Sequence, residues 1–138
     1  MESRMLKTVL TILLLATSGS ALAKWVQVGG NDDIATYVDP TTIRKSGNKV
    51  KMWTLMDYST QQQHKISDQT GKPYRSGKIQ EEYDCKEEQS RMLYFSCHSE
   101  NMGAGDVVCE SSDATKNWIP VPPGSLEDTI LKFACKKR

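Results

Sequence analysis

Three of the four cysteines lie close together in the middle of the chain, and they constrain the fold more than any other feature. Cys97 and Cys109 lie at equal distances on either side of Gly103, in a glycine-bearing turn between two apolar runs. If those runs are antiparallel strands, the two cysteines oppose each other at a Cα separation of about 4.5 Å, which suits a disulfide. The sequence therefore predicts a β-hairpin that is stapled across its two strands.

The N-terminal segment has the three parts of a secretory signal peptide. A short basic region is followed by an apolar run at residues 9–16 and by a small-x-small cleavage site that ends at Ala23. The apolar run is too short to span a bilayer. We expect cleavage between Ala23 and Lys24, which leaves one domain over residues 24–138 with no membrane span. The alternative is an uncleaved membrane anchor.

Charge and cysteine spacing argue against several kinds of partner and site. The chain carries 18 basic and 17 acidic residues, and removal of residues 1–23 leaves equal numbers of the two. A neutral chain gives no reason to expect nucleic acid or an acidic membrane surface as its partner. The cysteines form no Cys-x-x-Cys pair, so neither a zinc site nor thioredoxin-like redox chemistry is expected. In an exported chain, four cysteines favour two structural disulfides.

Alternating patterns predict a series of antiparallel strands. The clearest strand covers residues 50–58 and has apolar side chains on both faces, which indicates a central position with something packed over part of the second face. In the cysteine hairpin, alternation places Leu93 and Phe95 on the same face as Cys97. Further strands are predicted at residues 25–28, 34–38 and 75–85, and in the two arms of the hairpin.

Two segments between strands are predicted to be helical or irregular. Asp39 is a good helix cap and Pro40 suits a first helical position, so residues 39–43 predict one helical turn. The polar stretch from Gln61 to Tyr74 carries residues that break strands, and we expect a long, mobile hairpin connection there.

The C-terminal region predicts an extended segment followed by a helix. Residues 118–123 contain three prolines, which lack the donors of a central strand, so an extended crossing segment is expected. Ser125 is the predicted N-cap, with Asp128 completing a capping box. Apolar residues at helical spacing predict that one helix face packs down. The fold class is therefore α+β, an antiparallel meander of about six strands with a C-terminal helix packed on one face.

Four cysteines allow three pairings, and the predicted elements favour one of them. Cys135 on the helix should meet Cys85 on the sheet, which leaves Cys97 and Cys109 as the second pair. A link between Cys85 and Cys97 would contradict this topology.

Several segments together resemble one known family. They are Tyr37–Ile43, Trp53–Tyr58, Glu82–Cys85, Met102–Val108, Trp118–Ser125 and Ala134–Cys135. In their order and spacing the chain resembles the surface-adhesin E family, small exported proteins of Gram-negative bacteria. The resemblance covers nearly all of residues 24–138, and its last segments are the most specific.

The resemblance implies an antiparallel sheet with a C-terminal helix. It also implies that Cys85 and Cys135 are the family's cysteine pair and that Cys97 and Cys109 are additional. The best-known members bind host extracellular-matrix and serum proteins. Surface-displayed members can be lipid-anchored through a cysteine at the cleavage site, where this chain has Ala23. The expected location is therefore the periplasm or the cell surface of a Gram-negative bacterium.

The two histidines give no strong sign of chemistry. His64 lies in the polar stretch and is expected to be solvated. His98 follows Cys97, points to the opposite face of the strand, and is expected to be a lone, partly exposed side chain. Neither a metal nor a cofactor is predicted, and the haem or small-ligand alternative needs His98 or a methionine.

The acidic residues before the hairpin also predict no enzyme. Glu82 and Asp84 alternate toward water, so a solvated, salt-bridged face is expected in place of a glycosidase pair. Glu81 is different, because alternation puts it on the inner face beside Tyr83. It is expected at the sheet margin or next to a buried partner.

The sequence predicts a binding protein with a protein partner, either a host matrix protein or an envelope protein. As an adhesin-like module it would use strand edges, the 61–74 stretch and the hairpin tip. As a periplasmic inhibitor or envelope accessory protein it would use a rigid protruding tip. The sequence leaves open whether the protein forms a homodimer. The candidate contact residues at the tip are Asn101, Met102, Gly103, Ala104 and Gly105.

Overall fold

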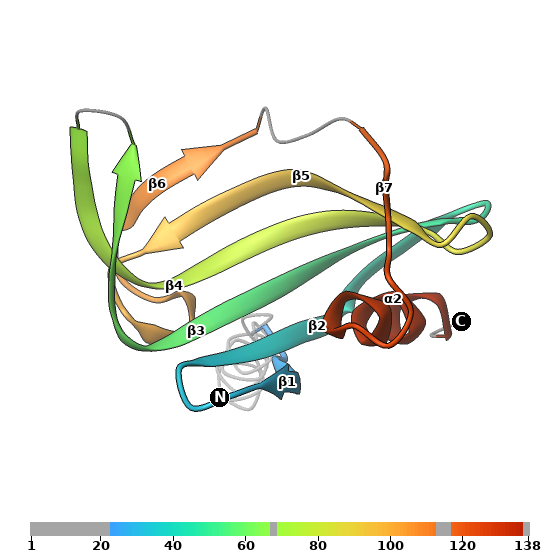
Figure 1. Cartoon of the computed structure of the whole chain (residues 1–138), viewed down its shortest axis with the longest axis horizontal. Helices are drawn as coiled ribbons and strands as arrows, with labels where there is room; N and C mark the ends of the chain where they lie inside the picture. Colours follow the sequence, from blue (N-terminus) through green and yellow to red (C-terminus); the bar gives the residue numbers. More distant parts are fainter. Residues whose placement is uncertain (1–22, 67–68, 113–116, 137–138) are drawn as a thin grey trace, which may run out of the picture.

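The computed structural model describes residues 23–66, 69–112 and 117–136, and they form one curved antiparallel sheet with a helix on one face (Figure 1). The strands follow one another in chain order from β1 to β6, and β7 pairs with β5. The elements are β1 Val26–Gly30, β2 Ile34–Ser46, β3 Lys49–Ile66, β4 Gln69–Asp84, β5 Gln89–His98, the 3-10 turn η1 Asn101–Gly103, β6 Val107–Ser111, β7 Ile119–Pro120 and α2 Leu126–Lys136. This architecture confirms the predicted meander with its C-terminal helix.

The predicted helical turn at residues 39–43 is wrong, because β2 continues through it. The pairing of β2 with β3 shifts register between Asp39 and Arg44. The capping side chains hold this irregularity in the strand. Asp39 Oδ1 accepts hydrogen bonds from Thr41 N–H at 2.9 Å and from its hydroxyl at 2.6 Å, and the Thr42 hydroxyl donates to the Asp39 carbonyl. The same short polar residues that cap helices also stabilise such breaks.

The predicted long connection from Gln61 to Tyr74 is also wrong. Strand β3 runs on to Ile66 and β4 begins at Gln69. Gln62 pairs with Tyr74 across this extension, which has two register irregularities. Pairing with the neighbouring strand gives the backbone N–H and C=O groups of these residues their hydrogen-bond partners.

The core lies between α2 and the half of the sheet beneath it. Its buried members are Val38, Val50, Met52, Tyr83, Val121, Ile130, Leu131 and Ala134. On the opposite face Leu55 is fully buried next to Gly103 of η1, which confirms that something covers part of the second face of β3. The helix begins as predicted, since the Ser125 hydroxyl accepts the Asp128 N–H at 3.1 Å. Asp128 in turn accepts from Gly124 N–H.

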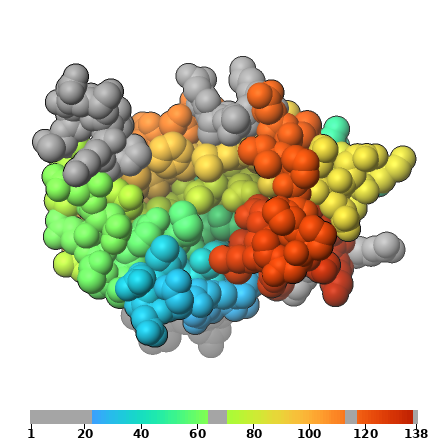
Figure 2. Space-filling model, in the orientation of Figure 1, coloured from blue at the N-terminus to red at the C-terminus, as the bar shows by residue number. Residues whose placement is uncertain are grey.

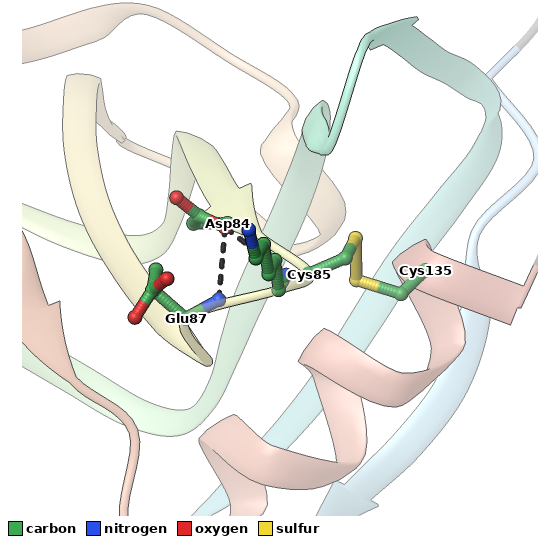
Figure 3. Close-up of a disulfide and its surroundings, with 5 residues drawn as sticks. Asp84, Cys85, Glu87 and Cys135 are labelled. Atoms are coloured by element: carbon green, nitrogen blue, oxygen red, sulfur yellow. Dashed lines mark hydrogen bonds between the residues drawn. A yellow bond between two sulfur atoms is a disulfide. The ribbon is translucent and has the colours of Figure 1, made fainter.

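Both favoured disulfides are present and use all four cysteines. Cys85, which directly follows β4, is bonded to Cys135 in the last turns of α2 (Figure 3), with a Cα separation of 5.8 Å. The neighbouring Asp84 carboxylate holds this turn by accepting the N–H groups of Lys86 and Glu87. Cys97 and Cys109 are register partners on β5 and β6, with Cα atoms 4.9 Å apart.

One bulge on β5 changes which side chains share a face. Gln80 pairs with Tyr94, and the next residue of β4, Glu81, pairs with Met92. Leu93 is therefore an extra residue of β5 without a register partner. A bulge of this kind re-aims the strand. The prediction that Leu93 shares a face with Phe95 is therefore wrong, and Met92 takes that position.

Candidate functional site

An apolar groove occupies the part of the helix-bearing face that α2 leaves uncovered. Figure 2 shows a hollow on this face, bordered by α2 and by the end of the β3–β4 hairpin. Its cavity volume is about 210 Å³. The lining residues are Met56, Tyr58, Tyr74, Gly77, Ile79, Met92, Phe95, Ser96 and Cys97. The groove is therefore built from three neighbouring strands, β3, β4 and β5.

Strand register places the apolar side chains of the groove in one layer. Met56 pairs with Gly77, and Ile79 pairs with Phe95. The bulge at Leu93 adds Met92 to the same face. All the apolar lining side chains other than that of Cys97 are half-buried, so each one keeps surface that a ligand can cover.

Two tyrosines form one end of the groove. The rings of Tyr58 and Tyr74 meet edge to face with centroids 5.7 Å apart, a favoured aromatic geometry. Burial, followed by the neighbouring Tyr74 phenol, raises the pKa of Tyr58. The hydroxyl of Tyr58 therefore stays neutral at the end of an apolar surface.

Glu81 lies at the border between the groove and the helix-covered core. On β4 it stands between Ile79 in the groove and Tyr83 under α2, and it pairs across the sheet with Met52 and Met92. Burial, followed by the adjacent carboxyl group of Glu127 on α2, raises the pKa of Glu81 to about 9. Glu81 is accordingly protonated at neutral pH. Its predicted inner-face position beside Tyr83 is confirmed, and of the two predicted surroundings the structure has the partner side chain rather than the sheet margin.

The hairpin tip is anchored to the sheet by its polar groups. The Asn101 side chain donates to Asp57 Oδ1 at 3.1 Å, and Met102 N–H donates to the same oxygen at 2.7 Å. Gly103 N–H donates to the Ser76 hydroxyl at 2.8 Å. The side chain of Met102 nevertheless remains 39% exposed. The tip therefore presents a fixed surface, and its role in binding stays a prediction.

His98 is buried, so the predicted partial exposure is wrong. Only 6% of its surface is exposed, and its Nε2 is 2.8 Å from the Ser96 hydroxyl. Burial, followed by the charge of Lys78, lowers the pKa of His98. Among the described residues no cluster of three or more His, Cys, Asp or Glu side chains is arranged to hold a metal. The side chain of His64 lies outside the part that the structure describes.

The predicted solvated acidic face is only partly right. Glu82 does form a salt bridge with Arg91, at 2.6 Å, but it is only 7% exposed. The Trp118 ring lies 4.6 Å from the Arg91 guanidinium, a cation–π contact that helps to cover the pair. The segment before β7 therefore covers a charge pair that strand alternation predicts to be exposed to solvent.

A second hollow, of similar volume, lies on the other face of the sheet. A cavity of about 230 Å³ is lined by Ala23, Trp25, Asp39, Thr42, Trp53 and Lys78. The Trp53 ring also meets Tyr94 edge to face at 5.7 Å. This hollow borders the predicted cleavage point, whereas residues 1–22 of the predicted signal peptide lie outside the described residues.

Sequence reasoning missed the groove, although one signal for it was present. A helix of 11 residues is about 16 Å long, while the 18 residues of β3 extend over about 60 Å. A helix this short covers only part of such a sheet, so apolar residues at the far end of the same face must lie open. The predicted length of β3 was too short to show this.

Comparisons with known proteins agree on one family. The family model described as surface-adhesin protein E matches residues 25–136. A crystal form II structure of Haemophilus influenzae protein E has a TM-score of 0.64 at 12% identity, covering 84% of this chain and 90% of that one. Protein E from non-typeable Haemophilus influenzae has a TM-score of 0.58 at 12% identity, covering 86% and 77%. At this identity the structures show a shared fold. Curated protein sequences give no significant match.

Proposed function

Because this chain belongs to the surface-adhesin protein E family, we propose that it is an exported, non-catalytic binding protein whose groove receives a segment of a partner protein. The observation that carries the proposal is the apolar, half-buried layer beside α2. Concave apolar surfaces that hold aromatic and methionine side chains are where binding energy concentrates in protein interfaces.

The shape of the groove favours an extended or helical segment as its occupant. The lining side chains come from adjacent strands and form a shallow trough closed at one side by α2 (Figure 2). An amphipathic segment can lay its apolar side chains into such a trough. The partner class proposed for the family, host matrix or serum proteins, fits this mode, as does an envelope protein.

Export accounts for the N-terminal sequence and for the two disulfides. Disulfides persist outside the cytoplasm, in the periplasm or at the cell surface of a Gram-negative bacterium. Ala23 and Lys24 are exposed and lie before β1, which supports a cleavage point outside the sheet. None of the helices described in the structure is long and apolar enough to cross a membrane.

A second candidate function uses the hairpin tip in place of the groove. The anchored residues 101–103 present Met102 on a fixed turn, which suits an inhibitor or an envelope accessory protein. A haem-binding role through His98 has less support, because that imidazole is buried and hydrogen-bonded to Ser96.

Binding assays with the chain 24–138 test these two functions against each other. Purified extracellular-matrix proteins and native envelope extract are probed with the wild type, with Phe95→Asp and Tyr74→Ser in the groove, and with Met102→Asp at the tip. Val107→Asp, at an exposed position on β6, is the matched control. We expect the groove variants to lose binding at least tenfold while both other variants retain it. Loss only with Met102→Asp would assign binding to the tip, and circular dichroism checks each fold.

A further inference from the structure

Three oxygen-bearing side chains meet where the groove reaches α2. Glu81 and Tyr83 come from β4, and Glu127 comes from the first turn of α2. Burial raises the pKa of Tyr83, and the carboxyl groups of Glu81 and Glu127 lie close enough to raise it as well. Met52 and Met92, the register partners of Glu81 on β3 and β5, carry no charge. The cluster is therefore a small polar site with apolar neighbours on both sides.

This cluster has more acceptors than donors. Tyr83 is completely buried, and within the described residues neither its hydroxyl nor Glu127 Oε1 has a hydrogen-bond partner of good geometry. A buried polar group without a partner costs about 1–3 kcal/mol. The proton on Glu81 and the O–H of Tyr83 supply two donors, which are fewer than the acceptor sites of two carboxyl groups and a phenol oxygen.

A compact cation with several donors would match these acceptors. A primary ammonium group supplies three N–H donors and one positive charge, and the cluster offers two carboxyl groups and a phenol oxygen. The planar, five-donor guanidinium of arginine needs a wider arrangement of acceptors. The adjoining groove walls at Ile79 and Met92 are apolar, which suits the methylene stem behind an ammonium group.

We propose that the Glu81–Tyr83–Glu127 cluster receives the ammonium group of a lysine side chain carried by the partner segment that lies in the groove. This inference rests on the proposed function and adds to it a preference for partner segments that carry a lysine. The lysine stem crosses the groove beside Met92, and its ammonium takes the place of the proton on Glu81, which is released to water. Glu127 is well placed for this role because a helix N-terminus holds a carboxylate in its first turn.

A titration with n-butylamine, the analogue of a lysine side chain, tests the proposal on the chain 24–138. Two-dimensional NMR follows the Met92 methyl group and the Glu81 amide at pH 7, with 1-butanol as the uncharged probe of equal length. We expect the amine to saturate at concentrations at least tenfold lower than the alcohol. Glu81→Gln, Glu127→Gln and Tyr83→Phe should each weaken the amine at least threefold and leave the alcohol unchanged. Glu87→Gln, at an exposed position, is the matched control.

Two outcomes would overturn the proposal. Equal affinity for amine and alcohol shows that the cluster does not select a cation. Unchanged amine binding in both Glu81→Gln and Glu127→Gln shows that the cation binds elsewhere. In either case, alcohol binding that is lost in Phe95→Asp still supports the groove, so failure of the lysine site is distinguishable from failure of the proposed function.

Discussion

Replacement of Glu81 by glutamine should remove a large part of the pH dependence of stability. The pKa of Glu81 rises from its ordinary 4.5 to about 9 in the folded protein, chiefly because of burial. A folded-state pKa above the unfolded value means that this group stabilises the fold fully below pH 4.5. The stabilisation is then lost as pH rises toward 9. Glutamine keeps a neutral, hydrogen-bonding side chain and does not titrate.

The size of the effect follows from the width of that pH window. One pKa unit corresponds to 1.36 kcal/mol, so between pH 4.5 and pH 7 the wild type loses about 3 kcal/mol relative to Glu81→Gln. Urea unfolding of the disulfide-bonded chain 24–138, measured from pH 4 to pH 9, gives the free energies of unfolding. The two proteins should be similar at pH 4, and the variant should be the more stable one at pH 7.

The control and the refuting result are equally specific. Glu87→Gln removes a carboxylate from an exposed turn and should follow the wild-type curve. The depressed pKa of Asp128, caused by the Gly124 N–H and Lys132, acts at low pH and is common to all three proteins. Parallel curves for wild type and Glu81→Gln across the whole range would refute the reasoning, because they would show that Glu81 is solvated.

Three further predictions concern the supports of the site. Replacing Cys97 and Cys109 together by alanine should cost about 3 kcal/mol by chemical unfolding, since the loop is short. Asp57→Ala should speed amide exchange of Met102 at least tenfold by NMR, because the bond to its N–H is lost. Arg91→Ala should lower the free energy of unfolding by about 2–4 kcal/mol at pH 7, because its buried carboxylate partner loses its charge pair.

Each of these predictions has its own control and contrary outcome. For the cysteine pair, retained stability would show that the hairpin is rigid without its bond. For Asp57→Ala, unchanged exchange at Met102 would show that the turn is held by its backbone alone, with the Leu55 amide on the same strand as reference. For Arg91→Ala, equal losses at pH 3 and pH 7 would trace the effect to packing on Trp118 and not to charge.

The sheet and its disulfides were predictable because they depend on local patterns. Alternation over residues 50–58 identified β3 as a central strand, and the spacing around Gly103 placed Cys97 opposite Cys109. The Ser125 cap likewise marked the start of α2. Each of these features is set by neighbouring residues whose chemistry admits one arrangement.

The wrong predictions concern segments whose side chains are compatible with two different local structures. Asp39 and its threonines cap a helix as readily as they hold a break in a strand, and the pairing with β3 decided between them. The polar 61–74 stretch joined the sheet because a neighbouring strand was available. Leu93 does not lie on its predicted face, because a single bulge reverses the alternation of side chains along β5. No residue type in the sequence indicates that a bulge occurs there.

The groove is formed by residues that are far apart in the chain and meet only when the strands pair. The sequence alone therefore does not indicate that these residues form one site. Phe95 and Met56 are far apart in the chain and meet only through the register of β3, β4 and β5. Glu81 is the exception. Its position on the inner face was visible from alternation, and Glu127 on the helix supplies the buried partner that was left unidentified.

The two ends of α2 are attached to the sheet in different ways, and this asymmetry gives the helix a pivot. Its last turns are bonded covalently through Cys135 to Cys85 (Figure 3), whereas its first turn meets the sheet only through non-covalent contacts, such as the Leu126 side chain beside Gly29 of β1. Any outward movement of the helix is therefore a swing about the Cys135 end. Such a swing widens the trough at its polar end first, where a charged side chain would enter.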